Sequence, residues 1–517
     1  MTERMLFLFS SSRSLKNVFW NLLGGFLCAI LVVLATPWYV SRLGIEGYGI
    51  VGLWIMMQAL MGMLDFGMGT TVIREFAQSS SDLAGNEYKR DLLRTLESFF
   101  WAIAILFILS LFFVAGWIGE NWLKSSTLPI NVIGKAIQLM AIALGLQFPS
   151  ALYANGLAGL QKHGRMNALS ILGNVLRYCG GIAVLFWQAD LVWFFFVQAL
   201  VSAIQTFVTR NVLWGMISNE KARPPAFRIK MLMQTWRFSM GMALSSIAAV
   251  LLANSDRIIL SKMMPTEELG KYAVAFTATG LLQLGIQPFY RAYFPRYSEL
   301  VSTLDLRRLH DVYFQSCKLM AVFVLSFGII GWMFAPQLFN IWLGKSDKTI
   351  VDVFRILLIG IGCSGLMWLP AALQHAHGWA SLHAAMIASA LIVGAPIMVL
   401  AIMRFGTIGA TSVWLLHGIS DITLGLWLMH KRLLIGKLID WYRSVLLLPL
   451  LICFPLAYLS WLLIPHNLSR WGNLFWIATT GVVVIATTFF LILILNWFSK
   501  SSSRHRSFFL ENNHGKG

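Results

Sequence analysis

Hydrophobic residues form long, nearly uninterrupted runs along almost the whole chain. Each run is long enough to cross about 30 Å of hydrocarbon as an α-helix, and it is far longer than a barrel strand. The pattern predicts about fourteen membrane-spanning helices, with ends placed to within a few residues. The predicted spans are 17–41, 48–73, 96–118, 130–155, 168–188, 191–213, 236–262, 270–293, 314–336, 352–373, 381–403, 406–429, 443–463 and 472–497.

The composition agrees with a chain that lies mostly in a bilayer. Of its 517 residues, 58% are hydrophobic and only 12% are charged. Soluble proteins carry about 25% charged residues, so no soluble core could hide this much apolar surface. No predicted loop exceeds roughly thirty residues, which is too short for a separate soluble domain. The sequence therefore predicts an all-α polytopic membrane protein.

The formal net charge of +18 comes from basic residues that lie mainly in short loops. These residues are concentrated on the side of the membrane that holds the N-terminus, and the richest loop runs from Arg210 to Arg237. Such a positive-inside pattern places both termini in the cytoplasm. No RNA- or DNA-binding motif accompanies the charge, so nucleic acid is excluded as a partner.

The sequence contains no P-loop, HExxH or GxSxG motif, and we expect neither an ATPase activity nor a cofactor. Its five cysteines lie far apart without a CxxC pair. His375, His377 and His383 flank one predicted loop. Because no acidic or cysteine partner lies nearby, they predict a solvated loop rather than a metal site.

Two segments six helices apart resemble each other. Residues 43–49 read LGIEGYG and residues 267–273 read EELGKYA, each in a tight turn after a long predicted helix. Copies separated by six helices share one orientation in the membrane, as in parallel repeats related by an axis along the membrane normal. The alternative is that any turn with Gly and Tyr looks alike.

Four groups of short motifs, placed at helix ends, carry a resemblance to a known family. They are Ser41–Gly49 with Asp65–Gly69 and Arg74–Ala77, Asn155–Gln161 leading to Asn167, Asp256–Ser261 with Leu269–Tyr272, and Phe294–Ser298. With this set the chain resembles the Wzx-type O-antigen flippases of the polysaccharide transporter family. The superfamily of that family also contains the lipid II flippases and the multidrug MATE exporters.

The resemblance implies two pseudo-symmetric six-helix bundles around a central cavity, with two peripheral helices. It also implies alternating access in a bacterial inner membrane, a substrate built on undecaprenyl diphosphate, and a polysaccharide polymerase as a possible partner. The expected division is a first bundle at 1–213, a basic cytoplasmic linker at 214–235, a second bundle at 236–430, peripheral helices at 431–497 and a cytoplasmic tail at 498–517.

Arg177 is the sharpest candidate for contact with the substrate. It lies near the middle of a predicted span, where a charge costs roughly 2.5–3.5 kcal/mol on insertion scales. Asn167, Ser170, Asn174 and Gly181 share its helical face. A polar face with a guanidinium suits a wet cavity that binds a diphosphate or an acidic sugar. The alternative is a structural arginine paired with an acid on a neighbouring helix.

Further candidates lie in the seventh and eighth predicted helices. Asp256 and Arg257 are adjacent in the sequence, so their side chains point in different directions on a helix. We expect Arg257 and Asn254 to face the cavity. An interhelical salt bridge that closes the outer gate is the alternative. Gln283, Gln287 and Tyr290 share one face of the eighth helix and are predicted to bind sugar hydroxyls. Glutamines also hold helices together, which is the alternative for them.

His417 and Asp421 lie one helical turn apart and are predicted to load and release a proton during transport. Their alternative is packing with an orienting hydrogen bond. Asp65, Arg74 and Asp256 are predicted to act in gating rather than in substrate contact.

Lys318 and Arg355 lie near span ends, where long basic side chains snorkel to the interface and anchor the helix.

Three functions follow from these observations. The first is a flippase that moves an undecaprenyl-diphosphate-linked oligosaccharide, an O-antigen or another surface-polysaccharide repeat unit, from the inner to the outer leaflet. The second is a multidrug exporter of the same superfamily, although buried arginines disfavour cationic cargo. The third is a membrane-integral polysaccharide polymerase or ligase, for which the short outer loops offer few catalytic candidates.

Overall fold

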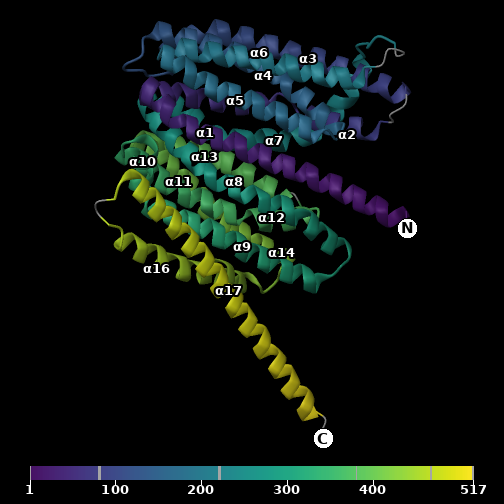
Figure 1. Ribbon diagram of the computed structural model, residues 1–517, viewed down its shortest axis with the longest axis vertical. Coiled ribbons are helices and arrows are strands. Elements are labelled where there is room, and N and C mark those ends of the chain that lie inside the picture. The colour runs from purple at the N-terminus through teal and green to yellow at the C-terminus, as the bar shows by residue number, and fades with distance from the viewer. Residues whose placement is uncertain (1, 80–82, 219–222, 380, 466–467, 515–517) are drawn as a thin grey trace. The chain divides into compact units, whose positions relative to one another are not determined.

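The computed structural model describes residues 2–79, 83–218, 223–379, 381–465 and 468–514, with side chains described outside 2–22, 29, 237–246 and 495–514. These residues are almost entirely helical, and no β-strand occurs among them (Figure 1). The helices form two compact units. The first unit holds residues 1–278 and 384–410, and the second unit holds residues 279–383 and 411–517.

The first unit is built around α4, which packs against both α3 and α6, while α1 packs against α5 and α7 (Figure 1). Its core includes the buried side chains of Phe76, Leu92, Phe100, Tyr153 and Leu213. Its helices are α1 (Thr2–Met63), α2 (Met68–Gln78), α3 (Leu83–Trp117), η1 (Ile118–Trp122), α4 (Ile130–Gly159), α5 (His163–Trp187), α6 (Leu191–Ile217), α7 (Ile229–Met263) and parts of α8 (Thr266–Ser302) and α13 (Ser381–Ser420).

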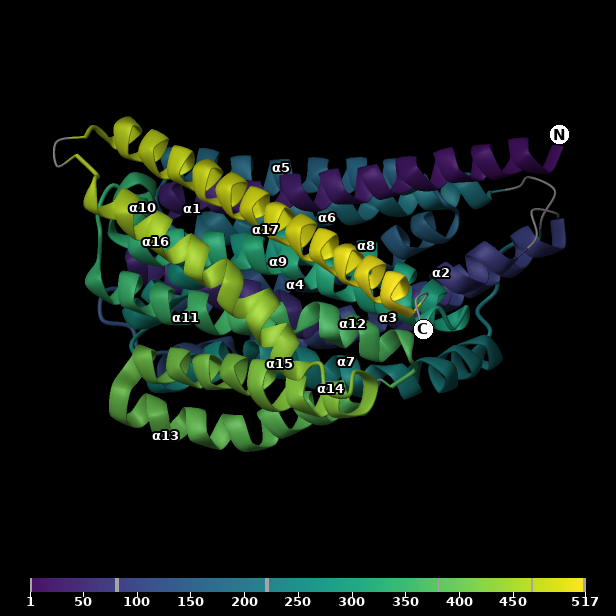
Figure 2. The same cartoon turned by 90° about the horizontal axis from the view of Figure 1, so that it is seen from below.

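The second unit places α9, α16 and α17 against one another (Figure 2). Ile330 of α9, Cys453 of α16 and Val484 of α17 form part of the core between these three helices. Its helices are the remainder of α8 and of α13, with α9 (Leu306–Met333), α10 (Ala335–Leu343), α11 (Lys348–Leu366), α12 (Trp368–Ala376), η2 (Asp421–Gly425), α14 (Leu426–Leu433), α15 (Leu438–Trp441), η3 (Tyr442–Leu447), α16 (Leu448–Leu462) and α17 (Arg470–His514).

Two of the long helices are broken at a glycine. Gly44 interrupts α1 with φ 75° and ψ 170°, and Gly406 interrupts α13 with φ 59° and ψ −138°. A positive φ is accessible to glycine at no steric cost. The sequence predicts span boundaries at both places, between 41 and 48 and between 403 and 406.

Small residues let α1 and α8 approach closely inside the first unit. A Cβ on Gly270 would lie 2.0 Å from the carbonyl oxygen of Ile45, and a Cβ on Gly49 would lie 2.4 Å from that of Thr266. Such contacts between small residues are a common way to pack helices in membranes. The two segments of the predicted internal repeat therefore lie against each other.

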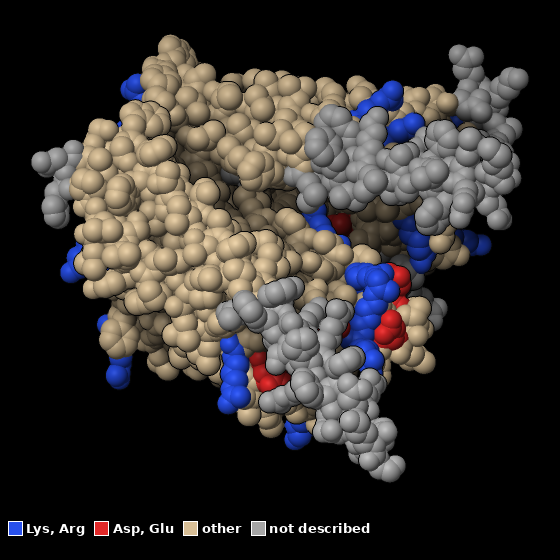
Figure 3. Space-filling view, turned by 60° about the horizontal axis from the view of Figure 1, so that its bottom comes forward, with Lys and Arg blue, Asp and Glu red and all other residues tan. Residues whose placement is uncertain are grey.

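Ten helical segments among the described residues are long and apolar enough to cross a membrane. They overlap twelve of the predicted spans, because Leu23–Met63 and Ser381–Leu433 each overlap two. The span predicted at 48–73 is interrupted, since α1 ends at Met63 and α2 begins at Met68. The spans predicted at 236–262 and 270–293 fall in α7 and α8, which are not among the ten, so the count of fourteen stays a prediction. On the face shown in Figure 3, wide stretches carry only uncharged side chains, as a lipid-facing surface requires.

Candidate functional site

Arg177 of α5 is buried between helices of the first unit, with 3% of its surface exposed. Its Nη1 donates to Ser202 Oγ at 3.4 Å, and its Nη2 donates to Gln205 Oε1 at 3.2 Å, both on α6. Its Cζ lies 5.5 Å from the ring centroid of Trp54 on α1. All of these partners are uncharged.

No carboxylate of a described residue forms an ion pair with this guanidinium, although buried cations in proteins are normally paired. The burial of Arg177 matches the structural alternative raised by the sequence, but the acidic partner that this alternative requires is missing from the described residues. A guanidinium offers five N–H donors, and the two hydrogen bonds to α6 use only some of them.

Glycines on α5 explain why α6 comes so close to Arg177. Gly173 and Gly181 lie one turn before and one turn after it. A Cβ on Gly173 would lie 2.4 Å from Gln205 Cδ, and a Cβ on Gly181 would lie 3.2 Å from Gln198 Nε2. Any larger residue at these two positions would push the amides of α6 away from the arginine.

The two asparagines of the predicted polar face make other contacts. The side chain of Asn174 donates to the carbonyl oxygen of Ser170 at 2.8 Å and to Cys28 Sγ at 3.4 Å. The side chain of Asn167 donates to the carbonyl oxygen of His163 at 2.9 Å. Each amide therefore makes a hydrogen bond to a backbone carbonyl oxygen of its own helix.

Asp256 of α7 is fully buried and accepts hydrogen bonds from the Tyr272 hydroxyl of α8 and from the backbone N–H of Arg257, the latter at 2.8 Å. The Arg257 Nε lies 3.9 Å from this carboxylate, and its Cζ lies 4.3 Å from the ring centroid of Phe276. In contrast to Arg177, Arg257 has an acid beside it.

Asn254, two residues before Asp256 on α7, is 3% exposed. Its amide nitrogen donates to the carbonyl oxygen of Val250 at 2.7 Å, and its Oδ1 is buried without a hydrogen-bond partner among the described residues.

Two residues predicted to act in gating take part in local structure around α2. Asp65 Oδ1 accepts a hydrogen bond of 2.8 Å from the backbone N–H of Gly69 in the first turn of α2. Arg74 pairs with Glu75 at 2.6 Å, and the other oxygen of Glu75 accepts a 2.9 Å hydrogen bond from Tyr88 on α3. These contacts do not test whether Asp65 and Arg74 act in gating, so that role stays a prediction.

The second unit contains a cavity of about 400 Å³ that brings four of the predicted residues together. These four are Gln283, Tyr290, His417 and Asp421. Its wall also contains Ile286, Ile361, Ser364, Gly365, Met367, Trp368, Ala371, His375, His383 and Trp414. Gln287 does not line it, and its side-chain oxygen accepts a 3.5 Å contact from Arg291.

His417 and Asp421 face each other across one helical turn, with His417 Nε2 3.7 Å from Asp421 Oδ2. Asp421 begins the π-helical turn η2, and only 9% of its surface is exposed. Short π-helical segments inside α-helices are frequent at functional sites. A protonated imidazole at this position would form an ion pair with the carboxylate.

The prediction that the three neighbouring histidines form a solvated loop is wrong for two of them. His375 lies in α12 and its Nδ1 is 2.9 Å from the Tyr290 hydroxyl, and its ring centroid is 5.4 Å from that of His383 in α13. Both line the cavity, whereas His377 is exposed. Sequence order placed these residues next to a loop, and only packing shows that two of the rings turn inward.

The sequence analysis also missed the partners of Arg177 on α6. Gln198, Ser202 and Gln205 are spaced by four and three residues, which puts them on one helical face. This polar stripe could have indicated the partners of Arg177. However, it lies in a strongly apolar span, and the sequence does not show which helix packs against α5.

Comparison with known proteins gives one family and several related structures. The model of the family described as "Polysaccharide biosynthesis protein" matches residues 14–301. A protein of Shigella flexneri named as an O-antigen transporter is 26% identical over 429 residues, which cover 81% of this chain and 98% of that protein.

Among solved structures, "Lipid II flippase MurJ, inward closed conformation" aligns with a TM-score of 0.71 at 12% identity, over 92% of this chain and 100% of that one. An inward-facing multidrug MATE transporter aligns with a TM-score of 0.65 at 13% identity, over 78% of this chain and 94% of that one. These two likenesses show the fold. The named relatives are transporters and not enzymes, which removes the polymerase or ligase hypothesis.

Proposed function

Because this chain belongs to the polysaccharide biosynthesis protein family, we propose that it is a flippase for an undecaprenyl-diphosphate-linked oligosaccharide. The cargo would be an O-antigen or another surface-polysaccharide repeat unit, carried from the inner to the outer leaflet by alternating access. The observation that carries the proposal is the buried guanidinium of Arg177, which has only neutral partners among the described residues. A cargo with a diphosphate supplies the missing negative charge.

The cavity of the second unit has groups suited to binding a sugar. Gln283 and Tyr290 offer an amide and a phenol, and Trp368 and Trp414 offer ring faces. Such a mixture of aromatic walls with a few polar groups is typical of small-molecule sites. His417 and Asp421 in the same wall are the candidates for coupling transport to a proton gradient.

The test replaces Arg177 with Gln and with Lys in a strain whose own gene is deleted, and it measures the translocation of lipid-linked repeat units. Loss of a charged hydrogen bond of about 1.5–3 kcal/mol predicts a decrease of roughly ten- to hundredfold for Arg177→Gln, with partial retention for Arg177→Lys. The matched control is Arg355→Gln, because among the described residues Arg355 donates a hydrogen bond to the carbonyl oxygen of Trp332 alone and stacks on its ring.

Protein levels in the membrane must be equal for the comparison. Normal translocation by Arg177→Gln would exclude the anion contact proposed here. Normal translocation in the deletion strain, with no redundant carrier present, would exclude the flippase function itself. Retained export of cationic drugs after charge reversal at Arg177 would favour the multidrug exporter.

A further inference from the structure

A short segment between η1 and α4 joins two helix turns of the first unit. Residues 121–127, which we call the strap, contact Glu46 near the break in α1 and the turn between α7 and α8. All of these residues belong to the first unit. Loop charge predicts that both turns and the strap lie on the outer side of the membrane. The strap therefore connects the first predicted bundle with the start of the second one at this side.

The contact of the strap with α1 is made by a buried carboxylate. Glu46 is 6% exposed, and it accepts hydrogen bonds from the backbone N–H groups of Ser126 at 2.7 Å and Thr127 at 3.0 Å, and from the Thr127 hydroxyl. Hydrogen bonds to an ionised carboxylate are roughly twice as strong as those between neutral groups. We therefore expect the strap to stay attached to α1 when other contacts break.

The strap also contacts the turn between α7 and α8, and we call these contacts the latch. The backbone N–H of Thr266 donates to the carbonyl oxygen of Lys124 at 2.9 Å, and Lys124 pairs with Pro265 as in a parallel β-bridge. Lys124 Nζ donates to the carbonyl oxygen of Met263 at 3.1 Å. The latch is thus made largely by main-chain groups.

Two side chains extend the latch along the end of α7. Trp122 Nε1 donates to Ser261 Oγ at 3.0 Å. Lys262 Nζ donates to the carbonyl oxygen of Asn121 and lies 5.3 Å from the Trp122 ring centroid. Lys124 and Lys262 are exposed, so water can replace their partners. Every acceptor in these bonds is uncharged, so opening the latch leaves no buried carboxylate without a partner.

We infer that the strap is a reversible lock on the outer side of the protein. The latch holds the α7–α8 turn against α1 while the outer side is closed. Opening to the outer side breaks the latch, and the strap moves away from α7 and α8 together with α1. The inference rests on alternating access, which is part of the proposed function, and it does not depend on the identity of the cargo.

The first test is a reversible crosslink across the latch. Lys124→Cys with Pro265→Cys, in a background without other cysteines, places two thiols at the β-bridge. A short bifunctional methanethiosulfonate should join them and lower translocation about tenfold or more relative to the uncrosslinked protein, because the closed state can no longer open. A reductant should restore translocation. The matched control, Glu46→Cys with Thr127→Cys, joins the strap to α1 and should translocate equally with and without the crosslink.

The second test weakens the latch without a crosslink. Trp122→Phe keeps an aromatic ring and removes the hydrogen bond to Ser261, so the open state should become about two- to tenfold more populated. The reporter is Thr277→Cys on α8, because the Thr277 hydroxyl lies 3.1 Å from the Tyr48 hydroxyl on α1. Its reaction with a soluble thiol reagent should become faster by the same factor. Trp117→Phe is the matched control, since the Trp117 ring is exposed.

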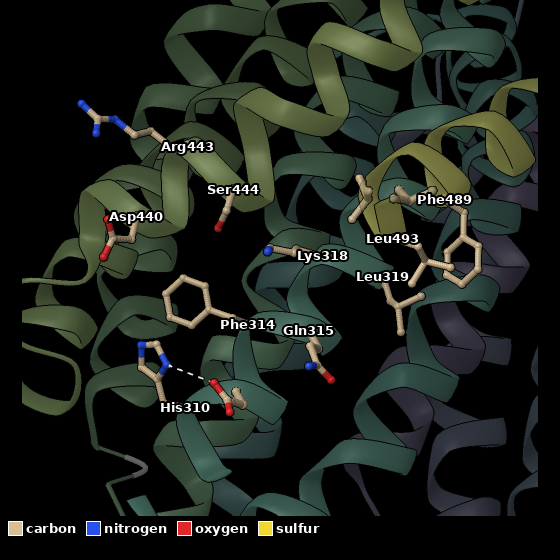
Figure 4. A pocket seen from close by; sticks show the side chains of 13 residues that line it. His310, Phe314, Gln315, Lys318, Leu319, Asp440, Arg443, Ser444, Phe489 and Leu493 are labelled. Carbon is tan, nitrogen blue, oxygen red and sulfur yellow. Dashed lines mark ion pairs between the residues drawn. The ribbon is translucent and has the colours of Figure 1, made fainter. Parts of the chain in front are cut away.

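A reporter in the second unit separates opening of the latch from a general loosening of the fold. Gln315 is exposed and lines a cavity of about 710 Å³ between α9, the α15–η3 segment and α17 (Figure 4). The strap and the latch belong to the first unit, so Gln315→Cys should react equally fast with and without Trp122→Phe. Faster reaction at both reporters would mean that the substitution loosens the whole protein, and it would overturn the inference.

Three further results would overturn the inference. They are normal translocation with the crosslink in place, failure of Lys124→Cys and Pro265→Cys to crosslink, and equal reactivity of Thr277→Cys in Trp122→Phe and Trp117→Phe. A block by the Glu46→Cys and Thr127→Cys crosslink would likewise contradict the attachment of the strap to α1. Absence of translocation by the parent protein would count against the flippase proposal instead, so the two failures are distinguishable.

Discussion

At the scale of single residues, His417 and Asp421 carry the expectation of ion coupling. If the proton that drives transport rests on this pair, Asp421→Asn should abolish the response to an imposed pH gradient, because an amide cannot take up or release the proton. Transport in proteoliposomes with and without the gradient measures this. Asp352→Asn on α11 is the control, since no hydrogen bond or ion pair joins the Asp352 side chain to another described residue. An unchanged gradient response in Asp421→Asn would exclude the pair.

Asp91 of α3 is expected to stabilise the segment between α6 and α7. Its carboxylate is 1% exposed and accepts hydrogen bonds from Arg223, from Arg228 at 2.7 Å and from the backbone N–H of Ala226 at 2.8 Å. Asp91→Asn removes the charge that three donors share, and it should cost about 1–3 kcal/mol. Thermal unfolding in detergent should show a lower midpoint for Asp91→Asn than for Glu120→Gln, which changes an exposed carboxylate. Equal midpoints would contradict this role.

The neighbours that the sequence could predict are those on the same helix, although the functions assigned to these residues stay predictions. The face of Arg177 and the pair His417 and Asp421 follow from the helical repeat alone. Partners on other helices, such as Gln205 for Arg177 and His375 for Tyr290, depend on which faces meet. A single sequence does not show which helix faces pack against each other. The residues that line the cavity could therefore be predicted only in part.

At the scale of elements, the close contact between α1 and α8 is expected to matter for translocation. Two glycine-to-alanine substitutions on α8, one at the contact and one away from it, test this. Gly270→Ala would put a Cβ 2.0 Å from the Ile45 carbonyl oxygen, whereas Gly280→Ala on the same helix meets no atom within 4 Å. Overpacking costs about 1–3 kcal/mol, which shifts a conformational equilibrium by roughly five- to hundredfold. Translocation should therefore fall in Gly270→Ala and remain normal in Gly280→Ala.

The direction in which Gly270→Ala shifts the conformational equilibrium can be measured by labelling a single cysteine. Thr277→Cys, in a background without other cysteines, places a thiol where the Thr277 hydroxyl lies 3.1 Å from the Tyr48 hydroxyl. Gly270→Ala should make this thiol more reactive toward a soluble reagent, because α1 and α8 must separate to accommodate the methyl group. Unchanged labelling together with normal transport would mean that the contact is not part of the transport cycle.

Element boundaries could be predicted where the chain changes direction. The breaks at Gly44 and Gly406 coincide with expected span boundaries because a positive φ and a gap in hydrophobicity occur together there. Short elements such as α10 and η2 could not be predicted, because they fall inside or beside apolar runs and have no periodicity of their own. The division into bundles at 1–213 and 236–430 also stays a prediction.

At the scale of the whole molecule, loop charge predicts the orientation of every span. A fusion of alkaline phosphatase after Ser126 should be active, because that loop is expected on the outer side, and a fusion after Asp305 should be inactive. Fusions of a fluorescent protein that folds only in the cytoplasm should give the opposite result at each site. The reverse pattern would invert the topology, and a mixed pattern would change the number of spans.

The uncharged surroundings of Arg177 also bear on how the chain enters the bilayer during synthesis. An arginine near the centre of α5 makes this helix a poor candidate for insertion by itself, at a cost of about 2.5–3.5 kcal/mol on translocon scales. Ser202 and Gln205, which accept its hydrogen bonds, arrive only with α6. The two helices should therefore leave the translocon together as a hairpin, and a nascent chain truncated before α6 should fail to keep α5 in the membrane.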